Sequence, residues 1–116
     1  MKQFMLLIAI ALVLKLAWST FGGSRYSREQ IAAIAASVNA DDVTMYTITE
    51  CPYCTEAMLW LTEHDLAYRE CNTEVDERCA TEFRRLGGVA VPFFVVRGMP
   101  MQGFDADRIL EQIANR

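Results

Sequence analysis

The spacing of hydrophobic positions changes along this chain, and the changes predict its elements. Residues Phe4 to Leu14 are apolar without a break, so a helix formed by them has no polar face. After Ser27, apolar residues recur at helical spacing, and Ser27 with Gln30 has the form of a capping box. These patterns predict an apolar N-terminal segment followed by a short amphipathic helix over residues 27–39.

The rest of the chain alternates between strand-like and helix-like stretches. The predicted strands cover residues 43–48, 66–70, 93–96 and 99–102. The predicted helices cover residues 55–65, 73–86 and 105–115. Pro100 demands an edge position for the last strand, because proline has no N–H to donate to a neighbour. The predicted order is β-α-β-α-β-β-α, and the second of these helices carries the apolar residues Val75, Phe83 and Leu86.

The apolar N-terminus suggests a membrane segment. Residues 4–21 approach the length of a bilayer span, although Lys15 interrupts them. We predict that residues 1–21 are a membrane anchor or a signal segment, and we favour an anchor that is not cleaved. The alternative is that these residues form a buried helix of the globular domain. Residues 22–41 are then a linker and the short helix, and residues 42–116 form one small domain.

The charged residues argue against nucleic acid as a partner and bear on the cellular compartment of the domain. The net charge of −4 provides no basic field for nucleic acid. Lys2 on one side of the apolar run and Arg25 and Arg28 on the other do not decide its orientation. The short basic start is similar to an export signal, so we expect a periplasmic or extracytoplasmic domain, with the cytoplasmic side left open.

The strongest chemical signal is Cys51-Pro52-Tyr53-Cys54, which lies between a predicted strand and a predicted helix. At a helix N-terminus, free backbone N–H groups and the positive end of the dipole favour a thiolate. Pro52 suits the first helical turn, where a missing N–H costs nothing. The pattern predicts a redox-active pair, with a zinc half-site or a structural disulfide as alternatives.

Three motifs in this order resemble the dithiol glutaredoxins. These are Cys51-Pro52-Tyr53-Cys54, Val91-Pro92 before an apolar strand, and Gly103-Phe104-Asp105 before the last helix. The resemblance covers roughly residues 42–116. It implies an α/β thioredoxin-like fold with a four-stranded mixed sheet flanked by helices, and thiol–disulfide oxidoreductase activity.

The resemblance also implies roles for individual residues. Cys51 is expected to be the nucleophile and Cys54 the resolving thiol. Tyr53 would line a glutathione groove, Val91 would offer its backbone to the substrate beside a cis Pro92, and Asp105 would hold the charged end of the substrate. No bound cofactor or metal is expected, and glutathione is the expected co-substrate, with disulfide-containing proteins as partners.

Two departures from the family pattern bear on the reductant. Ile48 stands where many glutaredoxins have a lysine for a glutathione carboxylate, and Ala90 replaces a threonine. The Gly103 turn is also similar to that of redoxins reduced by thioredoxin reductase. Glutathione and thioredoxin reductase therefore both remain candidates, and a protein binding a metal or an iron–sulfur cluster through Cys51 is the alternative function.

Cys71 and Cys79 are additional to these motifs. One ends a predicted strand and the other lies in the following helix, a separation that a disulfide can close. A structural disulfide would fit an oxidising compartment. Two free buried thiols, or a zinc site of all four cysteines, are the alternatives.

Overall fold

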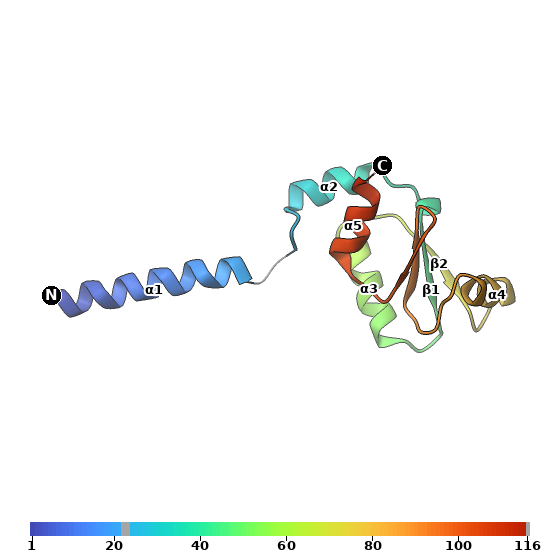
Figure 1. The fold of residues 1–116 in the computed structure, drawn as a ribbon, viewed down its shortest axis with the longest axis horizontal. Helices are drawn as coiled ribbons and strands as arrows, with labels where there is room; N and C mark the ends of the chain where they lie inside the picture. The colour runs from blue at the N-terminus through green and yellow to red at the C-terminus, as the bar shows by residue number, and fades with distance from the viewer. Residues whose placement is uncertain (22–23, 116) are drawn as a thin grey trace.

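The computed structural model describes residues 1–21 and 24–115, and the side chains of all of these except residues 17–21. Helix α1 (Lys2–Phe21) extends away from the folded remainder of the chain (Figure 1). Gly22 and Gly23, part of the predicted linker, lie outside the described residues. The division into domains at residues 21 and 41 stays a prediction.

Four strands form one mixed sheet. They are β1 (Val43–Thr47), β2 (Arg69–Asn72), β3 (Phe93–Val96) and β4 (Met99–Gln102). Their order is β2-β1-β3-β4, with β1 and β2 parallel and the β1–β3 and β3–β4 pairs antiparallel. The loops after β1, β2 and β4 and the loop before β3 therefore meet at one end of the sheet. The predicted four-stranded mixed sheet is confirmed, and β4 with Pro100 is an edge strand.

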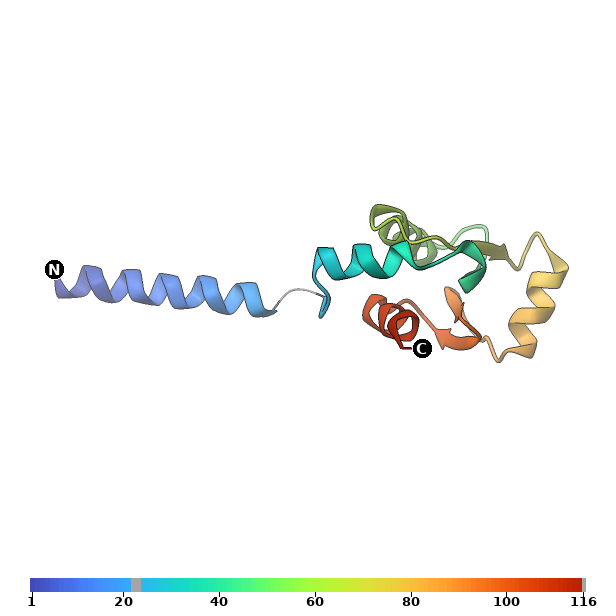
Figure 2. The same cartoon turned by 90° about the horizontal axis from the view of Figure 1, so that it is seen from above.

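Helices cover both faces of this sheet. Helices α2 (Arg28–Ala36), α3 (Pro52–Glu63) and α5 (Ala106–Ala114) lie on one face, and α4 (Glu77–Arg85) lies on the other (Figures 1 and 2). A single 3₁₀ turn, η1 (Ala40–Asp42), leads into β1. The main core lies under the three helices and includes Met45, Leu61, Phe94 and Leu110, all fully buried.

A second, smaller core lies between the sheet and α4. It consists of Tyr46, Cys71, Cys79 and Phe93, with Phe83 and Leu86 packed against them. The Tyr46 hydroxyl donates a hydrogen bond of 2.9 Å to the Glu82 carboxylate. Burial, followed by the hydrogen bond to Glu82 and its charge, raises the pKa of Tyr46 to about 12.

Helix α2 belongs to the folded part of the chain. The predicted capping box is confirmed, because Gln30 N–H donates to the Ser27 hydroxyl and Ser27 N–H donates to the Gln30 side chain. Ile31, Ala35 and Val38 are buried in the main core. The amphipathic stripe read from the sequence is therefore the face of α2 that packs on the domain.

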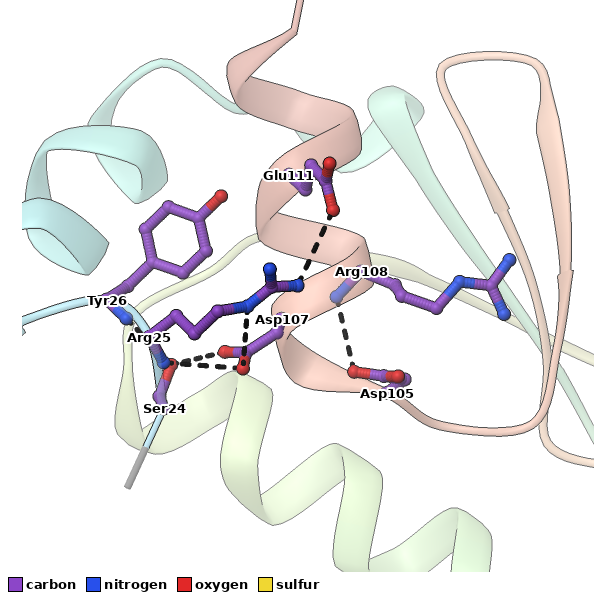
Figure 3. Close-up of polar contacts among 7 residues, drawn as sticks. All are labelled: Ser24, Arg25, Tyr26, Asp105, Asp107, Arg108 and Glu111. Carbon is purple, nitrogen blue, oxygen red and sulfur yellow. Dashed lines mark hydrogen bonds and ion pairs between the residues drawn. The ribbon is translucent and has the colours of Figure 1, made fainter. Parts of the chain in front are cut away.

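The segment before α2 is tied to α5 (Figure 3). The Ser24 hydroxyl and the Arg25 backbone N–H both donate to the Asp107 carboxylate. The Arg25 guanidinium lies 3.8 Å from both the Asp107 and the Glu111 carboxylates. The Ser24 hydrogen bond, helped by Arg25, lowers the pKa of Asp107 below its usual value. Ser24 and Arg25 thus attach the chain to α5 before α2 begins.

Two predicted elements begin later than expected. Strand β2 starts at Arg69 and not at residue 66, because Asp65 takes a positive φ of 52° and the Leu66 N–H donates back to Leu61. Helix α4 starts at Glu77 and not at residue 73, because the Asp76 carboxylate caps it by accepting from the Arg78 N–H. Val75 therefore lies in a turn and is 76% exposed, so its predicted place in this helix is wrong.

The predicted membrane anchor is not supported. Within residues 1–21 and 24–115, none of the helices is both long enough and apolar enough to cross a bilayer.

Candidate active site

The two cysteines of the Cys-x-x-Cys motif form a disulfide where β1 passes into α3. Every residue of β1 is buried, and the chain leaves it through residues 48–50 before the helix begins at Pro52. Cys51 is the N-cap of α3, and its sulfur accepts a hydrogen bond of 3.1 Å from the Cys54 N–H. The Cα atoms of the two cysteines are 5.2 Å apart. The sequence pattern thus places both sulfurs at a helix N-terminus, as predicted.

The two cysteine residues differ in exposure. Cys51 is half-buried, whereas Cys54 is 1% exposed and belongs to the main core. The Thr55 N–H and hydroxyl both donate to the Cys51 carbonyl, which holds the first turn of the helix in place. A disulfide substrate can therefore reach Cys51, and Cys54 is positioned behind it.

The loop before β3 meets the cysteine motif at the same end of the sheet. The Val91–Pro92 peptide bond is cis, as the resemblance implied. The Pro92 carbonyl accepts a hydrogen bond of 3.0 Å from the Gly103 N–H. In the part of the chain that the structure describes, nothing bonds to the backbone N–H or C=O of Val91. A substrate backbone can pair with these groups like an added strand.

The other two predicted binding residues stand on the first turns of helices. Tyr53 follows Pro52 in α3 and is 72% exposed. Asp105 is exposed and caps α5, its carboxylate accepting from the Arg108 N–H at 3.2 Å (Figure 3). The structure therefore shows Asp105 as a helix cap, whereas the binding of substrate by Tyr53 and Asp105 stays a prediction.

One residue at this end of the sheet escaped the sequence-based prediction. The side-chain amide of Gln102, the last residue of β4, donates to the Ala90 carbonyl at 2.6 Å and accepts from the Val89 N–H at 3.3 Å. A glutamine at the end of an edge strand carries no sequence signal for this contact, because the partner atoms belong to the backbone of a loop.

Cys71 and Cys79 also form a disulfide, between β2 and α4. Their Cα atoms are 5.4 Å apart, and the residues are 7% and 6% exposed. A lasting structural role for this bridge stays a prediction. Across residues 1–21 and 24–115, no three His, Cys, Asp or Glu side chains are grouped as a metal site would require.

Comparison with known proteins agrees with this geometry. The family model described as glutaredoxin matches residues 43–100, half of the chain. The chain belongs to the glutaredoxin family. The matched residues of this glutaredoxin-family protein contain the cysteine motif, the second cysteine pair and the cis proline, so the family match indicates a thiol–disulfide oxidoreductase.

Solved structures support the fold. The crystal structure of the thioredoxin-like protein BC3987 is 21% identical, with a TM-score of 0.55 over 60% of this chain and 97% of that chain. The crystal structure of a mutant of the same protein is 23% identical, with a TM-score of 0.55 over 63% of this chain and 99% of that one. No match was found among curated proteins. The glutaredoxin-family domain thus has a thioredoxin-like α/β fold.

Proposed function

We propose that this protein reduces disulfides of proteins, or mixed disulfides between proteins and glutathione, through Cys51 and Cys54. The Cys51 thiolate attacks one substrate sulfur, and the other substrate sulfur leaves as a thiolate that takes up a proton. Cys54 loses its proton and attacks the mixed disulfide at Cys51. The substrate gains two electrons and leaves as two thiols, which belong to one molecule for a protein disulfide and to two molecules for a mixed disulfide, and the protein is left with the Cys51–Cys54 disulfide.

The position of Cys51 at the N-cap of α3 is the observation that carries this proposal. Its sulfur already accepts the Cys54 N–H. After reduction, the same N–H and the positive end of the helix dipole stabilise a thiolate more than a thiol. Cys51 is also the more exposed of the two cysteines, which supports attack by Cys51 and the second step by Cys54.

Substrate binding is proposed to use the loop before β3. The unpaired backbone groups of Val91 suit an extended peptide, and glutathione is itself a short peptide. Tyr53 supplies an exposed aromatic face beside Cys51, and Asp105 with the first N–H groups of α5 supplies polar contacts for a charged end.

The reductant is the finer part of the proposal. We favour glutathione, two molecules of which reduce the Cys51–Cys54 disulfide and leave as glutathione disulfide. Ile48 provides no charge for a glutathione carboxylate, so thioredoxin reductase is the competing electron donor. Reduction of insulin and of hydroxyethyl disulfide should be followed with glutathione and glutathione reductase, and separately with thioredoxin reductase. Inactivity with both donors on both substrates would refute the proposed function.

We also propose that the domain works in an oxidising compartment outside the cytoplasm. The support is the second cysteine pair, which is bonded and buried, since disulfides that do not turn over persist in such compartments. Alkaline phosphatase, which folds only when exported, should be active when fused to the C-terminus. An inactive phosphatase together with an active cytoplasmic reporter would reverse this location.

A further inference from the structure

Gln102 holds the loop that presents Val91, and we propose that it is a positioning residue for substrate binding. The inference rests on the proposed function, because it concerns the backbone with which the substrate is expected to pair. The observation behind it is the set of hydrogen bonds made by the residues between α4 and β3.

Each neighbour of Val91 in this loop has a hydrogen-bond partner. The Gly87 and Gly88 N–H groups donate to carbonyls of α4, those of Arg84 and Phe83. The Ala90 carbonyl and the Val89 N–H bond to the Gln102 side chain. The Pro92 carbonyl accepts from the Gly103 N–H. Val91 alone keeps both of its backbone groups unbonded to the described residues, so the loop is fixed on both sides of the free position.

The Gln102 amide replaces a missing backbone partner. Strand β4 pairs with β3 as far as Gln102, which lies opposite Phe93. Beyond that point Pro92 has no N–H to continue the ladder. A primary amide carries a donor and an acceptor side by side, as a peptide unit does. The Gln102 side chain therefore extends the edge of the sheet to the two residues that precede Val91.

This positioning predicts a specific kinetic effect. With the amide removed, the loop would spend only part of the time in the conformation that presents Val91. The apparent affinity for a peptide substrate equals the intrinsic affinity multiplied by the fraction of time that the loop spends in this conformation. The sulfur chemistry at Cys51 does not change. The KM should rise while kcat stays nearly constant.

The test compares Gln102→Ala and Gln102→Glu with Met99→Ala, at the opposite end of the same strand. Glu keeps the acceptor for the Val89 N–H but directs a carboxylate at the Ala90 carbonyl. With a peptide–glutathione mixed disulfide as substrate, both Gln102 variants should show a KM raised about five-fold and a kcat within about two-fold of the unchanged protein. Met99→Ala should leave both constants unchanged.

Two further measurements separate positioning from a general structural role. Iodoacetamide has no backbone to pair with Val91, so its rate of alkylating reduced Cys51 should be the same in all variants. Hydrogen exchange at the Val89 amide should be faster in Gln102→Ala. An unchanged KM in both Gln102 variants, or an alkylation rate that falls together with activity, would overturn the role of Gln102 and leave the proposed function standing. An inactive unmodified protein would overturn both.

Discussion

The Cys71–Cys79 bridge offers a quantitative test of how this small domain is stabilised. The two cysteines are eight positions apart. Closing a loop of that length restricts the unfolded chain by an entropy worth about 2.5 kcal/mol at 25 °C. The free energy of unfolding should therefore fall by about that amount when Cys71 and Cys79 are both replaced by alanine. For a domain of this size the loss corresponds to a melting temperature lower by roughly 10–20 °C.

The cleanest measurement uses a parent that has only this bridge. With Cys51 and Cys54 replaced by serine, urea unfolding is measured with and without a strong reductant. The oxidised parent should unfold at a higher urea concentration, and the reduced parent should approach the Cys71→Ala/Cys79→Ala variant. That variant has no bridge, so reductant should leave its midpoint unchanged.

Selective reduction should distinguish the two bridges in the natural sequence. Cys51 is half-buried, whereas Cys71 and Cys79 are nearly inaccessible. Mild reductant followed by alkylation and mass spectrometry should label Cys51 and Cys54 first. Alkylation of Cys71 and Cys79 in untreated protein would refute the reasoning, as would equal unfolding free energies of the oxidised parent and the bridge-less variant.

Four further outcomes are expected. Cys51→Ser should abolish disulfide reduction, whereas Cys54→Ser should keep activity on glutathione mixed disulfides, because a second glutathione can replace Cys54; equal loss in both would contradict this. Glu82→Gln should lower the pKa of Tyr46 from about 12, measured by ultraviolet titration, yet leave it above 10, because burial is the larger cause of the shift. The raised pKa makes the contribution of Tyr46 to stability complete below about pH 10 and lost as the pH rises toward about 12, which urea unfolding at several pH values would show. Gly88→Ala should lower the free energy of unfolding by about 1–3 kcal/mol, because an added Cβ would lie 2.2 Å from the Phe83 ring; an unchanged urea midpoint would show that the ring gives way easily.

Local patterns predicted most of the elements and the redox pair. Strands β3 and β4 have the expected bounds, and the capping residue Ser27 was predicted correctly, because a cap depends on neighbours a few positions away. Strand β2 was predicted to begin too early because Leu66 is apolar, although Leu66 packs into the main core from the loop that precedes the strand. An apolar residue reports burial and does not distinguish a turn from a strand.

Contacts between distant segments were not available from the sequence. The Gln102 contact with the loop before β3, and that of Ser24 with Asp107, depend on the fold bringing those backbones and side chains together. His64 is half-buried, and its ring stacks on Trp60 with centroids 4.2 Å apart. Helical spacing puts these two residues one turn apart, and packing determined that they stack.

The two cysteine pairs are separated by the sheet. Cys54 belongs to the core beneath α2, α3 and α5, whereas Cys71 and Cys79 belong to the core beneath α4 on the other face (Figure 1). Four cysteines can form disulfides in three different pairings. A change of pairing requires a sulfur of one cysteine pair to attack a sulfur of the other pair. In the folded chain the strands stand between them, so electrons delivered to Cys51 and Cys54 cannot pass directly to Cys71 and Cys79. The proposed oxidation and reduction of Cys51 and Cys54 would then leave the Cys71–Cys79 bridge unscrambled.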